Sequence, residues 1–374
     1  MEWNIPTMVR NPRTIDWNVT KMHQNIRAID SDSIFWMFQY LNEDYDYLAL
    51  KWRIYFTLLG IQVIYYPFLA AVGVTVNVMT IVILSRGKCG LSKCVTRYLV
   101  AMAAGDLMVV IIDLILRHIP IVFERQFDFL KSIPLCNIHA ALLFAATDCS
   151  VWFTVTFTFD RFVAICCEKL KTKYCTEKTA AVVLGTVSVL SCLKNIFWYF
   201  MFTGEFTLVN IPWFCWITRG VLDSLVWPVI ELLYYALTPF VPFVLILLLN
   251  AFTIRHILVA SRARRRLRSH SSRESSGDPE MESRRKSIIS LFVISGNFIL
   301  LWALFMVYSI SNRMRWLGYY SLYLPDFIQE LGFMLQLLSC CTNTCIYAVT
   351  QTKFREEQKN VVKYPFTAII KYMK

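Results

Sequence analysis

Seven long apolar stretches, separated by shorter polar ones, form the main pattern of hydrophobic and polar positions along this chain. A helix needs about 20 mostly apolar residues to cross a bilayer core of about 30 Å. Gly and Pro inside such stretches are tolerated better in membrane helices than in soluble ones. The pattern therefore predicts an all-α membrane protein built as a bundle of seven transmembrane helices. The predicted helices cover residues 54–84, 98–119, 133–166, 179–202, 225–257, 287–310 and 321–349.

The same pattern divides the chain into three parts. Residues 1–53 are polar and lack the apolar core of a signal peptide, so the first membrane helix is expected to act as the targeting signal. Residues 54–350 form the seven-helix domain, and residues 351–374 follow it. A long inner loop is expected at about 258–286, because the stretch 269–283 is rich in Ser, Glu, Gly and Pro.

The distribution of charge predicts the orientation of the bundle. The formal net charge is +12, and the excess of Lys and Arg lies in the first, third and fifth connections between helices. Cytoplasmic loops carry this excess in membrane proteins, so we expect an extracellular N-terminus and a cytoplasmic C-terminus at the plasma membrane. Because membrane orientation accounts for the positive charge, we do not expect the protein to bind nucleic acid. Asn18 begins a glycosylation sequon in the segment that is expected outside.

A charged pair ends the third stretch. Asp160 and Arg161 stand there, followed by Phe162. The simplest interpretation is a helix boundary at which the arginine side chain reaches the interface. Cys136 lies 25 residues before Arg161, and at about 1.5 Å per residue this separation is close to one membrane thickness. The third stretch therefore has a cysteine at its outer end and the charged pair at its inner end.

The order of further motifs resembles that of rhodopsin-like G-protein-coupled receptors over residues 55–360. The matching positions are Asn77, Asp106, Cys136, Asp160, Arg161, Phe162, Pro242, Phe298, Trp302, Asn343 and Tyr347. The resemblance implies a receptor and not an enzyme, with a heterotrimeric G protein, an extracellular small-molecule or peptide ligand and membrane lipid as partners. It also implies a short amphipathic helix beginning near Phe354, on the inner face of the membrane.

The resemblance assigns roles to further residues. It implies a disulfide bond between Cys136 and Cys215. It implies a sodium pocket, for which the alternative is a water-filled polar cluster without a specific ion; its residues are Asn77, Asp106, Ser150, Ser339 and Asn343. Carboxylate, hydroxyl and amide oxygens are the hard ligands that such an ion prefers. No other metal or cofactor is expected. The ligand cavity is expected to involve Asp113, Leu143, Trp227, Glu231 and Phe305.

A narrower resemblance and several departures refine this interpretation. The segment Ser150-Val151-Trp152-Phe153-Thr154-Val155 is similar to the orphan family called probable G-protein coupled receptor 139, which implies aromatic amino acids or peptides as ligands. Leu143 stands where amine receptors carry an aspartate, which disfavours a monoamine. Thr344 stands where most rhodopsin-like receptors carry a proline.

An ion-coupled secondary transporter is the main alternative function. Charged groups inside membrane spans mark ion paths by default, and Asp106, Asp113 and Asp148 qualify. Lys194 in the fourth stretch is a candidate partner for one of these carboxylates. No internal repeat of the transporter type is evident in the sequence. The ordered motifs therefore favour the receptor.

Overall fold

A computed structural model describes most of the chain, including all seven predicted helices. The described ranges are residues 50–123, 136–203, 216–217, 226–268, 279–351 and 353–361. Within them, seven helices are long and apolar enough to cross a membrane. The predicted fold class is therefore confirmed. One small antiparallel pair of strands accompanies the helices: β1 (Phe202–Thr203) pairs with β2 (Trp216–Ile217).

Several of the seven spans are built from more than one helical segment. In chain order the segments are α3 (Leu50–Ser85), α4 (Lys93–Val109), η3 (Val110–His118), α5 (Ile119–Val122), α6 (Cys136–Cys166), α7 (Glu168–Tyr174), α8 (Glu177–Asn195), α9 (Trp198–Met201), α11 (Val226–Tyr235), η5 (Ala236–Phe240), α12 (Val241–Arg268), α13 (Pro279–Trp316) and α14 (Asp326–Thr350). A short helix at 353–361 follows. Its residue Phe354 is fully buried and packs its ring against Tyr347.

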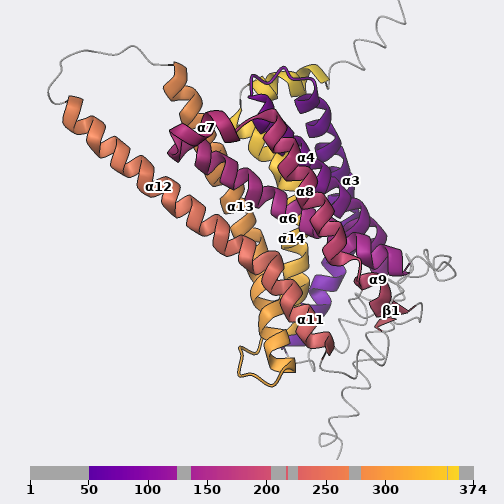
Figure 1. Ribbon diagram of the computed structural model, residues 1–374. Coiled ribbons are helices and arrows are strands. Elements are labelled where there is room, and N and C mark those ends of the chain that lie inside the picture. The colour runs from indigo at the N-terminus through magenta and orange to yellow at the C-terminus, as the bar shows by residue number, and fades with distance from the viewer. Residues whose placement is uncertain are drawn as a thin grey trace, which may run out of the picture.

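Helix α6 lies at the centre of the bundle. It contacts α4, α8, α12 and α13, and Figure 1 shows it between these helices. The apolar windows of α6 and α14 are each 67% buried, whereas that of the fourth span is 22% buried. Because apolar residues that protein does not cover face lipid, the fourth span lies at the edge of the bundle. The centre of the bundle is therefore formed mainly by α6 and α14.

The basic connections gather at one end of the bundle. Figure 1 shows the connection between α3 and α4, helix α7 and the helix at 353–361 together at that end, with α9 and β1 at the opposite end. Arg97 near the start of α4 pairs with Glu177 at the start of α8, at 2.8 Å. This arrangement matches the separation of charge that the sequence predicts.

Three expected helix boundaries differ from those in the structure. Helix α12 continues to Arg268 and α13 begins at Pro279, so both ends of the predicted loop 258–286 are helical. Hydropathy marks where a helix leaves the apolar layer, and Ala, Arg and Leu continue a helix readily in water. The last span begins at Asp326, later than expected, because Pro325 precedes it in an extended conformation.

Two spans contain wider π-helical turns that the pattern did not predict. They are η3 in the second span and η5 in the fifth. In η5 the backbone of Thr238 leaves helical geometry, with φ −152° and ψ 103°, just before Pro239. Proline lacks a backbone donor and clashes with the preceding turn, so the fifth span is kinked at this point.

Candidate functional site

The inner end of α6 holds a buried ion pair. Nε of Arg161 donates to Oδ2 of Asp160 at 3.0 Å, and Nη2 contacts the same oxygen. The thiol of Cys94 donates to the other oxygen of Asp160 at 3.3 Å. The thiol of Cys175 donates to the backbone carbonyl of Asp160 at 3.6 Å. Asp160 is fully buried. The positive charge of Arg161 is therefore held against its own helix.

A polar cluster lies deeper in the bundle, where three helices meet. Asp106 of α4 accepts one hydrogen bond from Ser150 of α6 and one from Asn343 of α14, each at 2.6 Å. These residues are at least nine-tenths buried. The structure thus brings together three of the five residues predicted for the sodium pocket.

The other two predicted pocket residues have different partners. The indole of Trp302 donates to the hydroxyl of Ser339 at 3.0 Å, which joins α13 to α14. The amide of Asn77 donates to two backbone carbonyls, those of Gly73 and Cys340. Asn77 therefore joins α3 to α14 rather than contacting the carboxylate through its amide nitrogen.

Aromatic rings in tilted and T-shaped arrangements surround Trp302. The ring of Phe298 lies 5.4 Å from that of Trp302, and the ring of Phe305 lies 6.2 Å from it. The Phe305 ring also contacts Tyr235 at 5.9 Å and Phe333 at 5.2 Å. A continuous aromatic core thus connects α13 with α11 and α14.

Two ion pairs lie in the outer half of the described helices. Asp113 of η3 pairs with Arg117 at 2.9 Å and lies 3.5 Å from His118. Glu231 of α11 contacts Arg313 of α13 through both carboxylate oxygens, at 2.9 and 3.0 Å. Sequence reasoning missed both arginines because each stands near the end of an apolar stretch, where a basic residue is expected anyway.

The chain also matches a known protein family. A family model described as "7 transmembrane receptor (rhodopsin family)" matches residues 76–347, which is most of the chain. The chain belongs to this rhodopsin family. The receptor class is thereby confirmed, and receptors of this family are in general not enzymes. The family does not favour the transporter alternative, and the narrower resemblance to the orphan family stays a prediction.

The receptor does not gather all predicted cavity residues in one place. Leu143 packs among apolar residues of α3, η3 and α14. The ring of Trp227 lies 5.6 Å from that of Trp198, at the interface between α9 and α11. Glu231 and Phe305 lie along one path through Tyr235, which follows Glu231 by one turn. Asp113 reaches the same rings through its partner Arg117, whose guanidinium lies 5.0 Å from the centre of the Phe333 ring. Phe333 in turn contacts Phe305.

Three of the predicted switch residues are placed by packing. Phe162 is half-buried, and its ring lies 6.5 Å from that of Phe159. Pro242 is buried in the first turn of α12. Tyr347 is fully buried beside Phe354. The structure thus places these three side chains within the bundle. Their roles in signalling stay predictions.

The predicted covalent features lie partly beyond the described part of the chain. Cys136 is disulfide-bonded. Its expected partner Cys215 lies outside the described residues, as does the sequon at Asn18, so that pairing and the glycosylation stay predictions. The ten other cysteines of the described ranges are free.

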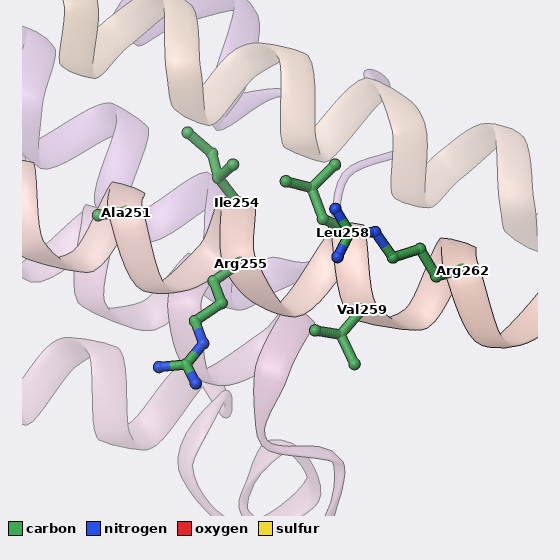
Figure 2. A pocket seen from close by; sticks show the side chains of 6 residues that line it. All are labelled: Ala251, Ile254, Arg255, Leu258, Val259 and Arg262. Carbon is green, nitrogen blue, oxygen red and sulfur yellow. The ribbon is translucent and has the colours of Figure 1, made fainter.

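One open pocket of about 580 Å³ lies on the inner half of α12. Figure 2 shows Ile254 and Leu258 on one side of that helix and Arg255 and Val259 on the other. All six lining residues belong to α12, so the pocket is a groove along a helix surface. It contains no residue of the predicted ligand cavity. Figure 1 shows this half of α12 diverging from the other helices.

Proposed function

We propose that this receptor transmits an extracellular chemical signal to heterotrimeric G proteins through Arg161. The observation that carries the proposal is the buried pair of Asp160 and Arg161 at the inner end of α6, within a rhodopsin-family fold. When the neighbouring helices move apart, water reaches the guanidinium and weakens its pairing with the adjacent carboxylate, because exposed ion pairs contribute little. The arginine side chain can then turn away from its own helix. Released, it presents its donors to a partner protein.

The coupling follows from the contacts of α13. Phe298 and Trp302 pack against Val151 and Val155 of α6, and Trp302 also donates to Ser339 of α14. A ligand shifts a two-state equilibrium only by its difference in affinity for the two states. Movement of α13 relative to α6 is therefore the event that a ligand has to favour.

The ligand is proposed to be a small molecule or a peptide with charges of both signs and an aromatic group. Asp113 with Arg117, and Glu231 with Arg313, supply both signs of charge in the outer half of the bundle. The rings near Phe305 supply an apolar surface. Aromatic amino acids, which the narrower resemblance implies, have this chemistry.

The membrane placement is proposed from charge. The N-terminus lies outside the cell and the C-terminus lies inside, at the plasma membrane, because the basic connections share one end of the bundle. Exposed Arg255 and Arg262 near the inner end of α12 suit contact with anionic lipid headgroups.

A sodium ion is proposed at Asp106. The Ser150 hydroxyl and the Asn343 amide each lie within hydrogen-bonding distance of the buried Asp106 carboxylate, and all three groups carry oxygen atoms. This donor set fits a hard cation. When bound, the ion would neutralise the Asp106 carboxylate and stabilise the arrangement of α4, α6 and α14 around it.

Nucleotide exchange tests the proposed function. Receptor in lipid nanodiscs is mixed with purified G proteins of each class and screened with aromatic amino acids and short peptides. We expect ligand-dependent exchange that Arg161→Ala abolishes. The matched control is Arg97→Ala, which removes an exposed arginine that pairs with Glu177 at the same end of the bundle. Exchange that is unchanged in Arg161→Ala would show that this residue does not couple the receptor to the G protein.

A further inference from the structure

A lysine inside the fourth span joins three helices through a single ammonium group. Nζ of Lys194 lies 2.6 Å from Oδ2 of Asp148 in α6 and donates to the hydroxyl of Thr238 in η5 at 3.2 Å. It also lies 5.1 Å from the centre of the Tyr234 ring in α11. A carboxylate, a hydroxyl and a ring face thus surround one cation.

The surrounding groups hold the carboxylate in place. Asn195 donates to Asp148, and the indole of Trp198 donates to the Asn195 oxygen at 3.0 Å. Asp148 and Asn195 are fully buried. An ionised group inside a membrane span is costly unless it is paired, and Lys194 is the pairing partner that the sequence suggested. The charge of Asp148 is therefore compensated within the bundle. This pair explains the buried carboxylate, so an ion path is not needed to account for it.

The hydroxyl that Lys194 contacts belongs to the residue at which the fifth span bends. Thr238 is 1% exposed and has non-helical backbone angles. A helix interrupted by a π turn and a proline lacks the regular hydrogen bonds that would set its direction. Contacts from neighbouring helices then decide the direction of the bend. Lys194 supplies such a contact, and it is anchored to the central helix through Asp148.

We propose that Lys194 is a positioning residue that fixes the bend of the fifth span and thereby sets the ligand-independent activity of the receptor. This inference rests on the proposed function. The bend determines how α11 meets α13. Glu231 of α11 pairs with Arg313, and the Tyr235 ring contacts the ring of Phe305. Lys194 therefore controls the contact between the fifth span and the helix whose movement is proposed to release Arg161.

Whether loss of the Lys194–Thr238 contact raises or lowers activity depends on the state in which the contact is made. Arg161 is paired with Asp160 in this structure, which is the resting arrangement in the proposed mechanism. A contact made only in the resting state lowers the free energy of that state alone. Loss of the Lys194–Thr238 contact is therefore expected to raise ligand-independent nucleotide exchange.

The first pair of variants removes only the contact with the bend. Thr238→Val deletes the hydroxyl and keeps the branched shape, and Thr238→Ser keeps the hydroxyl. In Thr238→Val, backbone amides of the fifth span near the bend should exchange with deuterium about tenfold faster. Ligand-independent nucleotide exchange should rise roughly fivefold or more. Thr238→Ser should resemble the wild type in both measurements.

The second pair separates positioning from stability. Lys194→Met leaves Asp148 buried without its cation, so the melting temperature should fall by roughly 5 °C or more. Asp148→Asn combined with Lys194→Met removes both charges and should restore most of that loss. If Lys194 positions the bend, the double variant still shows fast amide exchange near Thr238 and raised nucleotide exchange, because the contact is still missing.

Two results would overturn the inference. One is that Thr238→Val and Thr238→Ser behave alike in amide exchange. The other is that the double variant regains wild-type amide exchange together with its stability, which would mean that Lys194 only compensates a buried charge. Amide exchange is measured without G protein. Failure of the proposed function, seen as a wild-type receptor that promotes no nucleotide exchange, is therefore distinguishable from failure of the positioning role.

Discussion

The hydroxyl of Thr344 lies 2.6 Å from the hydroxyl of Thr80, across the interface between α14 and α3. Thr344 donates to the Val76 carbonyl at 3.0 Å, so Thr80 is the donor between the two hydroxyls. A proline, which most rhodopsin-like receptors carry at this position, would make neither contact. The departure from the family motif therefore adds a buried polar connection between the first and last helices.

Replacing Thr344 by valine should lower the stability of the receptor. It removes two buried hydrogen bonds, each contributing about 1 kcal/mol, and the melting temperature should fall by roughly 2–4 °C per kcal/mol. Thr344→Ser keeps the hydroxyl and should stay near the wild type. Thermal unfolding of the purified receptor measures both. Because the two hydroxyls form one contact, Thr80→Val and Thr344→Val should be less than additive; full additivity would show that the hydroxyls act independently.

Gly332 should not tolerate a side chain. A Cβ added there would lie 3.0 Å from the Cα of Phe305, so α13 and α14 would have to separate. Gly332→Ala should therefore lower the melting temperature and disturb the packing of Phe305. Gly296→Ala in α13 is the matched control, since no heavy atom lies within 4 Å of its added Cβ. There the helix propensity of alanine should leave stability unchanged or slightly higher, by up to about 1 kcal/mol. Equal losses in the two variants would contradict the close approach of the helices.

Sodium should stabilise the receptor through Asp106. In sodium chloride the wild type should melt at a higher temperature than in choline chloride of equal ionic strength, because only the smaller hard cation fits a carboxylate–hydroxyl–amide set. Asp106→Asn keeps the size of the side chain and removes the charge, so its melting temperature should be the same in both salts. A wild-type melting temperature that does not depend on the cation would favour the alternative of a water-filled polar cluster.

Cys175 should react slowly with thiol reagents at neutral pH. Burial is the largest cause, and the nearby Asp160 carboxylate adds to it; together they raise the pKa of the Cys175 thiol to about 11. The thiolate is the nucleophile, and at pH 8 only about one Cys175 thiol in a thousand is ionised. Alkylation followed by mass spectrometry should therefore give a rate that rises about tenfold per pH unit up to that pKa. A fast, pH-independent reaction would place Cys175 away from Asp160.

The sequence predicted much of this receptor because the relevant signals are local. Whether about 20 consecutive residues are apolar enough to cross a bilayer depends on those residues alone, so the seven spans and their order could be predicted. The motif residues were also found, because Asp160 and Arg161 are adjacent in the chain. The ends of the helices were harder to predict from the sequence. Hydropathy falls at the membrane surface, whereas α12 continues to Arg268 because its backbone hydrogen bonds persist in water.

Contacts between helices required the tertiary structure. The sequence offers Lys194 as a partner for a carboxylate, but it stands 46 positions from Asp148, and no spacing selects Asp148 over the other carboxylates. Glu231 and Arg313 are 82 positions apart, and no pattern links them. Apolar spans specify that seven helices lie side by side in the membrane, but not how each is rotated about its axis. Packing of small residues and the need to pair every buried charge select those rotations. The class of the protein was thus determined by the sequence itself. The three-helix contact of Lys194 and the bend that it reaches at Thr238 were decided by the packing.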